Sequence, residues 1–350
     1  MPVSSDPQTR SISPADVSVI VPVGGGAPTW ERCFEALRDL DPVPGEIIAV
    51  FDGPGNEGRE QTAARGARVV RLDRRGGPAR ARNEGARAAR GEVLLFVDSD
   101  VEVPPDLVGR VARLFTMGPD LAAVIGSYDD APGDPGFFSQ YRNLLHHYVH
   151  QHGREDASTF WGACGAVRRA VFVEAGGFDE SYPLPSIEDI ELGSRLKREG
   201  RSIRLVKDLQ VKHLKRWRPG EMLSTDLLRR AVPWSELMLR RREMANDLNV
   251  RMRDRASVFF AWLLVVSLAT CGLDLAVGGG ASALSVLALV SLNLDLFRFF
   301  VRARGWLFAL VVVPWYWIYL LICGLGFVMA WFRCLGSCRA MARERRRGAP

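Results

Sequence analysis

Cysteine and lysine are scarce in this chain of 350 residues. The six cysteines form no C-x-x-C pair, which excludes the common zinc and dithiol redox motifs. Cys33 and Cys164 are expected to be buried thiols in a reducing compartment. Only four of the 46 basic residues are lysines, so arginine carries nearly all of the basicity. The polar first sixteen residues lack the apolar core of a signal peptide, and we expect the domain after them to stay in the cytoplasm.

Charged residues are nearly absent from Ala256–Phe332, where only two aspartates and three arginines occur. The mean hydropathy of zero therefore averages a charged, water-soluble first two-thirds with a membrane-embedded last third. Arginine clusters precede and follow the apolar region, as expected on the cytoplasmic side of a membrane. Basic residues interleaved with exposed aromatics are missing, so no nucleic-acid partner is expected.

Short apolar runs alternate with helical patterns over the first part of the chain. Val17–Val23, Glu46–Asp52 and Val93–Asp98 predict buried strands, and Pro78–Arg90 predicts a helix between two of them. This alternation indicates an α/β fold with a mostly parallel, Rossmann-like sheet, which binds ligands at the carboxyl ends of its strands. Further strands are expected at Ala67–Leu72, Leu121–Gly126, Phe160–Val167, Ile203–Val206 and Gln210–His213, with helices at Thr29–Leu40, Pro104–Met117 and Ile187–Gly200.

Three apolar segments are expected in the last third. Ala256–Val277 and Ala281–Leu294 predict a helical hairpin that turns at Gly278–Gly280, and Leu296–Arg304 predicts an interfacial segment. Trp306–Phe332 is broken by Pro314: it either crosses the bilayer once, which puts the arginine-rich tail outside, or turns back at Pro314 or Gly324–Gly326 as a re-entrant segment. The sequence leaves the side of the C-terminus open.

Acidic side chains end two of the predicted strands. Asp98 and Asp100 form a D-x-D motif after a buried run, and two such carboxylates can hold one hard divalent cation and leave positions for phosphate oxygens. Asp52 ends another strand, where it either accepts hydrogen bonds from a nucleobase such as uracil or simply forms a turn. Arg80, Arg82 and Asn83 begin a helix, a place that favours anions, although a solvated helix face has the same composition.

Glu188 and Asp189 open a helix, where one carboxylate can act as general base or both can serve as ordinary N-terminal charges. Three further groups complete the set of candidate residues: Trp161-Gly162 in a glycine-containing strand, His213 at a strand end, and Arg216-Trp217, which also suits a membrane interface.

The order of these motifs resembles that of the family 2 glycosyltransferases of the GT-A fold, from about Val17 to Trp217. The resemblance implies inverting transfer from a nucleotide-diphosphate sugar with Mg²⁺ or Mn²⁺. It implies donor contacts from Asp52, Arg80, Arg82, Asn83 and Asp98, metal contacts from Asp100 and His213, and a catalytic base at Asp189. The acceptor would contact Trp161, Gly162, Glu188, Arg216 and Trp217.

Two departures from the family pattern stand out. His213-Leu-Lys-Arg-Trp217 is similar to the Q-x-x-R-W of processive synthases and ceramide glucosyltransferases, but His replaces Gln, which weakens the case for processivity. Glycines follow Val21-Pro22-Val23 where the family has an aromatic-Asn pair, which leaves open how the ribose is held.

We therefore expect a GT-A-like domain with C-terminal transmembrane helices, anchored as a multi-pass protein in the cell membrane with its catalytic domain in the cytoplasm. The expected reaction is hexosyl transfer, from a UDP-sugar in preference, to a hydroxyl of a membrane lipid or lipid-linked glycan. A polyprenyl-phosphate synthase and a non-catalytic sugar-nucleotide scaffold are the alternatives. The expected divisions are a disordered terminus 1–16, the catalytic domain 17–217, interface helices 218–255, the membrane region 256–332 and a basic tail 333–350.

Overall fold

The computed structural model describes residues 11–24, 29–55, 60, 66–242 and 247–347. The chain folds into two compact units, Met1–Arg216 and Trp217–Pro350. Residues 1–10 of the expected disordered terminus and Gly25–Gly26 of the expected first turn lie outside the described residues. Residues 11–16 form ordered structure instead: Pro14–Asp16 is a short 3₁₀ turn, η1, and both backbone groups of Ile12 bond to the Thr116 hydroxyl at 2.9 Å.

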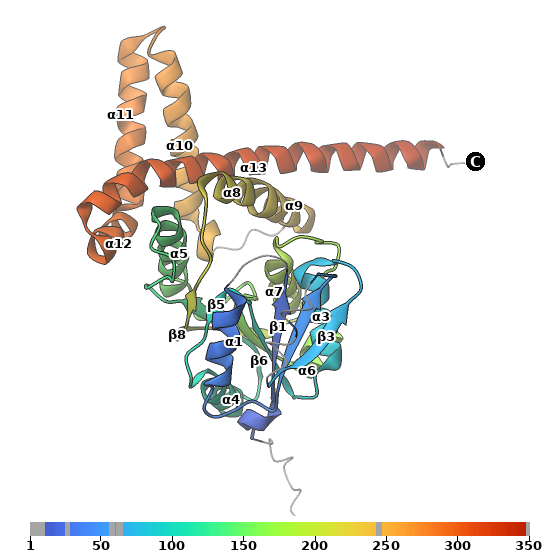
Figure 1. Cartoon of the computed structure of the whole chain (residues 1–350). Coiled ribbons are helices and arrows are strands. Elements are labelled where there is room, and N and C mark those ends of the chain that lie inside the picture. Colours follow the sequence, from blue (N-terminus) through green and yellow to red (C-terminus); the bar gives the residue numbers. More distant parts are fainter. Residues whose placement is uncertain (1–10, 25–28, 56–59, 61–65, 243–246, 348–350) are drawn as a thin grey trace, which may run out of the picture. The chain divides into compact units, whose positions relative to one another are not determined.

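The first unit is built on one eight-stranded sheet in the order β3-β2-β1-β4-β7-β6-β8-β5 (Figure 1). The first four strands in this order run parallel, β7 runs antiparallel to β4 and β6, and β6 and β8 are again parallel. This confirms the expected mostly parallel α/β sheet. The strands are β1 Val17–Val23, β2 Glu46–Asp52, β3 Arg68–Leu72, β4 Val93–Val97, β5 Val101–Glu102, β6 Leu121–Tyr128, β7 Cys164–Arg168 and β8 Ser202–His213.

Helices cover the sheet because their apolar faces complete its core. All side chains of β1 and β4 are buried, as expected of central parallel strands. Gly85 lets α3 lie directly on the sheet, since a Cβ there would meet Ile20 and Val50. The helices of this unit are α1 Trp30–Arg38, α3 Gly77–Ala88, α4 Leu107–Met117, α5 Phe137–Gln151, α6 Arg169–Glu174 and α7 Glu188–Arg198.

Two strand predictions differ from the structure. The strand expected from Phe160 begins only at Cys164. The two short strands expected before His213 are one continuous strand, β8, whose pairing with β6 shifts register around Gly126. A Cβ at Gly126 would collide with the carbonyl oxygen of Leu209, so the glycine permits the close approach at this irregularity.

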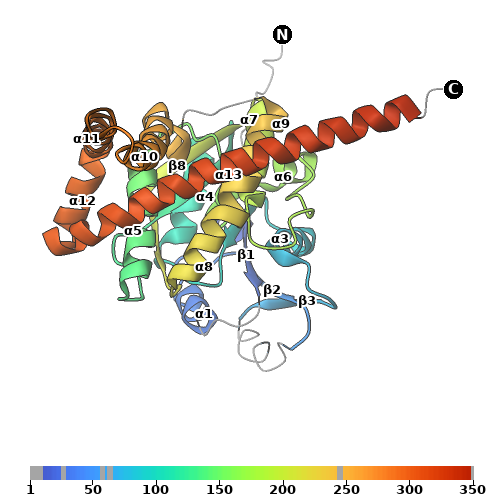
Figure 2. The ribbon, with the colours of Figure 1, turned by 90° about the horizontal axis from the view of Figure 1, so that it is seen from above.

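In the second unit, the residues that the structure describes form helices and the turns between them. Its first elements are α8 Pro219–Ser224, the π-helical segment η2 Thr225–Ala231, α9 Val232–Arg241 and the short turn η3 Leu248–Val250. They are followed by α10 Met252–Thr270, α11 Leu275–Leu292, α12 Leu294–Arg304 and α13 Trp306–Arg347. Helices α10 and α11 lie side by side as a hairpin (Figures 1 and 2), and the Ser267 and Ser282 hydroxyls join them near the turn at 2.9 Å.

The hairpin turn lies at residues 271–274, and its predicted position at Gly278–Gly280 is wrong. Asp274 accepts hydrogen bonds from the N–H groups of Ala276 and Val277, at 2.9 and 3.1 Å, and so caps a helix that begins before the glycines. Gly278 lies within α11, where a Cβ would meet the backbone of Cys271. The glycine therefore serves close packing at the turn.

Helix α13 is continuous, so neither the expected break at Pro314 nor a turn at Gly324–Gly326 occurs. The structure contains two helices that are long and apolar enough to cross a membrane, Leu275–Leu292 and Trp306–Gly336, among the residues it describes. Only 17% and 22% of these segments are buried within the protein. A long apolar helix in the core of a soluble protein is mostly buried, and these two helices are not.

Candidate functional site

Two loops at the ends of β4 and β8 bring the D-x-D motif beside His213. Asp98 follows the last residue of β4, and the short strand β5 then pairs antiparallel with the end of β8, with Val101 opposite His213. The N–H of Leu214 donates to the carbonyl of Asp100 at 2.8 Å, which closes this contact. As a result the Oδ2 atom of Asp100 lies 3.7 Å from the Nε2 atom of His213.

The imidazole of His213 is buried and held by an aromatic neighbour that the sequence analysis did not single out. Tyr128, the last residue of β6, stacks on it with ring centres 4.3 Å apart and an interplanar angle of 18°. Trp161 meets the same tyrosine edge-on at 4.9 Å. Two of the predicted residues, His213 and Trp161, are therefore joined through Tyr128.

The Asp100 carboxyl is poised to stay ionised. Burial acts to raise its pKa, but the neighbouring His213 and the charge of Lys215 outweigh burial, so the net pKa is lowered. An ionised carboxylate beside an imidazole nitrogen is a suitable pair of ligands for a divalent cation. The described residues contain no group of three or more His, Cys, Asp and Glu side chains placed to hold a metal, so further ligands would have to come from a donor and water.

Arg82 connects the D-x-D motif to the start of α7. Its Nη2 group donates to the Oδ1 atom of Asp98 at 2.6 Å, and its Nη1 group donates to the Oε1 atom of Glu188 at 2.9 Å. The side chains of Arg82 and Glu188 are each only 5% exposed, so this pairing is almost free of solvent. Burial alone would lower the pKa of Arg82, but Asp98, Glu188 and Asp189 raise it. Arg82 is thus held as a buried counter-ion to predicted site residues.

Gly162 lies against the guanidinium group of Arg82. A Cβ at this position would be 2.8 Å from Nη2 and 2.9 Å from Cζ of Arg82, a group that its two carboxylate partners hold in place. The N–H of Gly162 also donates to the Oδ2 atom of Asp189 at 3.1 Å. Glycine is needed here because a Cβ would displace the guanidinium group of Arg82, while the N–H of the same residue bonds to Asp189.

Asp189 occupies the first turn of α7 beside Glu188. Its Oδ1 atom accepts from the N–H of Ile190 at 2.8 Å, in addition to the bond from Gly162. Burial and the charge of Glu188 raise the pKa of Asp189 to about 6, against the opposing effects of Arg82 and the two N–H groups. This carboxyl is ionised at neutral pH and readily takes up a proton, which suits a general base.

Two predicted donor contacts are engaged inside the protein. The carboxylate of Asp52 accepts from the N–H groups of Gly76 and Gly77, at 2.7 and 2.9 Å, and so fixes the turn that begins α3. The amide nitrogen of Asn83 donates to the carbonyl of Phe178 and to Glu180, both at 2.9 Å, and its oxygen accepts from the N–H of Phe178. Both amide hydrogens of Asn83 are used, so this side chain can only accept hydrogen bonds from a bound ligand.

The other predicted residues lie at the margins of this network. Arg80 is half-buried on the first turns of α3, and its side chain fills the space that a Cβ of Gly76 would need. Arg216 is exposed at the end of the first unit, and Trp217 begins the second unit.

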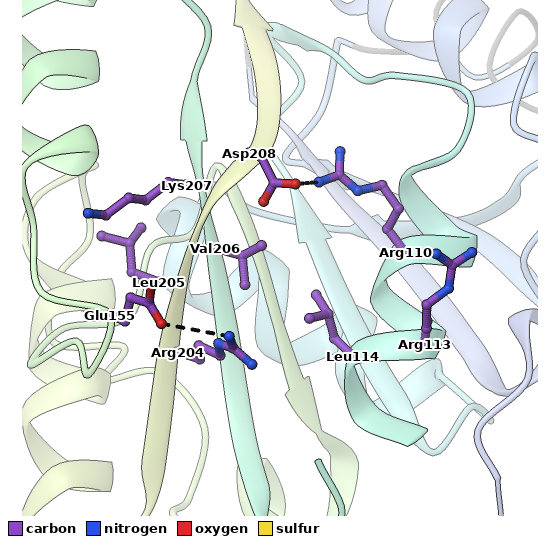
Figure 3. A pocket seen from close by; sticks show the side chains of 9 residues that line it. All are labelled: Arg110, Arg113, Leu114, Glu155, Arg204, Leu205, Val206, Lys207 and Asp208. Carbon is purple, nitrogen blue, oxygen red and sulfur yellow. Dashed lines mark hydrogen bonds and ion pairs between the residues drawn. The ribbon is translucent and has the colours of Figure 1, made fainter. Parts of the chain in front are cut away.

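A separate groove lies between α4 and β8 and has a cavity volume of about 340 Å³ (Figure 3). Arg110 pairs with Asp208 at 2.6 Å across it, and Arg204 lies 3.7 Å from Glu155. Figure 3 shows Lys207 directed away from the side on which Asp208 lies, as the alternation along a strand requires. The groove contains none of the predicted site residues, and two of its arginines are already paired.

Comparison with known proteins finds sequence similarity over part of the first unit. Residues 18–176 match the family described as "Glycosyl transferase family 2". Over 111 residues the chain is 34% identical to the succinoglycan biosynthesis protein ExoO of Rhizobium meliloti, in an alignment that covers 31% of this chain and 32% of that protein. Over 101 residues it is 42% identical to the uncharacterized glycosyltransferase EpsJ of Bacillus subtilis, in an alignment that covers 28% of this chain and 29% of that protein. These alignments span about a third of the length of the curated relatives.

Among solved structures, the fold is similar to that of the mannosyltransferase PcManGT from Pyrobaculum calidifontis, solved in complex with GDP-Man and Mn²⁺. The TM-score is 0.54 at 17% sequence identity, and the superposition covers 91% of this chain and 89% of that chain. At this identity the likeness establishes the fold alone.

Proposed function

We propose that this chain, whose residues 18–176 match the family described as "Glycosyl transferase family 2", transfers a hexosyl group from a nucleotide-diphosphate sugar to an acceptor hydroxyl with inversion at the anomeric carbon. The observation that carries this proposal is the carboxylate of Asp189, whose pKa is raised to about 6 at the edge of a network that includes Asp98 and Arg82. A base with this pKa is ionised at neutral pH and accepts a hydroxyl proton during attack on the sugar.

In the proposed mechanism the chain supplies three functions. Asp189 takes the proton of the acceptor hydroxyl. The N–H of Gly162 and the position of Asp189 on α7 orient its carboxylate. Arg82 holds Asp98 and the start of α7 at fixed separation, because one planar guanidinium bonds to both. Asp52 keeps the turn at Gly76–Gly77 in place, and its remaining lone pairs can accept from a nucleobase N–H, for which we favour uracil.

A divalent cation, Mg²⁺ or Mn²⁺, fits the pair formed by Asp100 and His213. Their ligand atoms are 3.7 Å apart, close enough to share one ion after a small adjustment, and both side chains are anchored by strand pairing. When bound, such a cation would neutralise the diphosphate leaving group. Tyr128, stacked on the His213 ring, would hold that ring in place.

We further propose that the second unit anchors the enzyme in the cell membrane with its catalytic unit in the cytoplasm. Apolar side chains cover the outside of its helices: Leu273, Leu275 and Phe332 are 89%, 76% and 67% exposed. Large apolar side chains exposed to this extent are typical of contact with lipid. The acceptor is then a lipid or lipid-linked glycan that the bilayer presents, and Trp161, Glu188 and Arg216-Trp217 stay candidates for its binding.

The test is release of nucleoside diphosphate by the full-length protein in detergent, with Mn²⁺, a panel of nucleotide sugars and a membrane lipid extract. Asp189→Asn should lower turnover by at least about 100-fold, while donor affinity stays within a few-fold. Asp208→Asn is the matched control, because this aspartate is 83% exposed in the groove between α4 and β8. Full activity of the Asp189→Asn protein would overturn the assignment.

The same experiment distinguishes the alternatives. A phosphate acceptor is already ionised at neutral pH and has little need of a base, so a polyprenyl-phosphate synthase would depend only weakly on Asp189. A non-catalytic scaffold would bind a nucleotide sugar and release no nucleoside diphosphate from any donor, with or without lipid.

A further inference from the structure

We propose that α13 lies in the plane of the membrane at the open end of the α10–α11 hairpin and does not cross the bilayer. Its arginine-rich C-terminal end then stays on the side of the membrane from which α10 enters. The partner is a lipid surface that carries anionic headgroups. The inference rests on the membrane location proposed above, and it settles the topology that the sequence left open.

The hairpin has a defined base and tip. At the base, the side-chain nitrogen of Asn293 donates to the hydroxyl of Ser257 at 3.0 Å. The tip is the turn at residues 271–274, where Leu273 is 89% exposed. Helix α11 has 18 uncharged residues, or about 27 Å of helix, close to the thickness of about 30 Å of the hydrocarbon core. The uncharged part of α10, Ala256–Thr270, has 15 residues, or about 22 Å, and its charged first turn would lie among the headgroups. The hairpin can therefore reach across the apolar layer if the layer is locally thinned around α10.

Two contacts of α13 with the hairpin lie near this base. The hydroxyl of Tyr316 donates to the side-chain oxygen of Asn293 at 3.1 Å, at the end of α11. Gly324 lies against Val258 and Trp262, in the first half of α10. These two contacts are eight residues apart, or about 12 Å along α13, slightly more than the 8–10 Å between the axes of packed helices. Helix α13 therefore passes from one leg to the other across the base, and does not run along either leg.

The remainder of α13 continues away from the hairpin onto α9. Gly326 packs on Ala231 and Val232, where a Cβ would collide, and the Nη1 group of Arg333 lies 3.3 Å from Glu236. Figures 1 and 2 both show α13 extending across the direction of α10 and α11. If the hairpin stands along the membrane normal, α13 has to lie near the membrane plane.

Charge at both ends of α13 agrees with this arrangement. Arg302 and Arg304 immediately precede its apolar stretch, and Arg333 follows it, ahead of five more arginines in the tail. A crossing would place one of these groups on the far side, against the positive-inside rule, whereas an in-plane helix keeps both beside anionic headgroups. Leu307 and Leu310, both 63% exposed, supply apolar surface for the acyl chains.

The test is cysteine accessibility in inside-out and right-side-out membrane vesicles from a bacterial host that expresses the full chain. The background keeps the fully buried Cys33 and Cys164, and replaces the other four cysteines by serine. Single cysteines are then introduced as Met117→Cys in the first unit, Leu273→Cys at the hairpin tip and Ala349→Cys in the tail, and are labelled with a membrane-impermeant maleimide. A C-terminal epitope cleaved by added protease provides a second measurement that needs no cysteine substitution.

The in-plane arrangement predicts that Ala349→Cys is labelled at least about tenfold faster in the same vesicles that expose Met117→Cys, and that Leu273→Cys is labelled in the opposite vesicles. Labelling of the tail from the side of the hairpin tip would show that α13 crosses and would overturn the inference. Labelling of all three sites from one side would also overturn it, because the hairpin would then not span. Complete release of the protein by carbonate washing would instead refute the membrane location itself.

Discussion

The raised pKa of Asp189 predicts a specific pH dependence of turnover. Burial and the neighbouring charge of Glu188 raise this pKa to about 6, from an ordinary value of 3.8. If Asp189 is the base, kcat/KM follows its ionised fraction, so activity is at its plateau above pH 7 and falls as the pH drops through about 6. At pH 5 about one molecule in eleven has the ionised form, so kcat/KM should be about tenfold below the plateau. A carboxyl with the ordinary pKa would lose less than about 10% at this pH.

The assay is nucleoside diphosphate release at saturating Mn²⁺ over pH 4.5–8, with protein returned to pH 7.5 afterwards to check that acid causes no lasting inactivation. Glu188→Gln should move the acid limb to lower pH, because it removes a negative charge beside Asp189 and keeps a hydrogen-bond acceptor for Arg82. Imidazoles in general titrate in the same range. A His213→Gln protein is therefore the control: its residual activity should keep the same acid limb. A flat profile from pH 5 to 7, or a limb that vanishes with His213→Gln, would refute the assignment of the base.

Three further predictions follow from the same network. Gly162→Ala should lower kcat by about 100-fold with a smaller change in donor KM, measured by steady-state kinetics, because its Cβ would displace Arg82 or the N–H that orients Asp189. Arg82→Met should destabilise the protein by about 3–5 kcal/mol, measured as a loss of thermal stability in detergent, because it leaves two carboxylates without their buried partner; Arg82→Lys should cost less. Asp100→Asn should weaken Mn²⁺ binding in the presence of nucleoside diphosphate by at least about tenfold, measured by electron paramagnetic resonance, with wild-type thermal stability as the check on folding.

The sequence predicts the sheet and the location of the site well because both depend on local patterns. Apolar runs of β-branched residues identify β1, β2 and β4, and the acids that follow two of them lie at the carboxyl ends where parallel sheets bind ligands. The order of motifs also resembles that of the family whose model matches residues 18–176. These signals need no knowledge of how distant segments pack.

Pairings between distant segments were not predictable in this way. Arg82 and Glu188 are 106 residues apart, and an arginine on the first turns of a helix gives no sign of whether it faces phosphate or a buried carboxylate. Tyr128 stacks on His213 only because β6 and β8 are neighbours in the sheet. The hairpin turn was misplaced because glycine usually interrupts a helix, whereas Gly278 allows close packing and Asp274 supplies the cap.

The charge balance of the site explains why Arg82 is better suited to hold carboxylates than to bind a diphosphate. The site combines four acidic side chains, Asp98, Asp100, Glu188 and Asp189, with the positive charges of Arg82 and Lys215, which act on them. With all four acids ionised, two negative charges stay uncompensated. Two like charges 4 Å apart near a protein surface repel each other by about 4 kcal/mol. A diphosphate placed there would be repelled to this extent for each such pair of charges. Arg82 does little to relieve this repulsion, because its single charge is already counted against the carboxylates and its Nη1 and Nη2 groups bond to Glu188 and Asp98. Donor binding should therefore depend on a divalent cation beside Asp100 and His213, whose two charges offset those that the carboxylates leave.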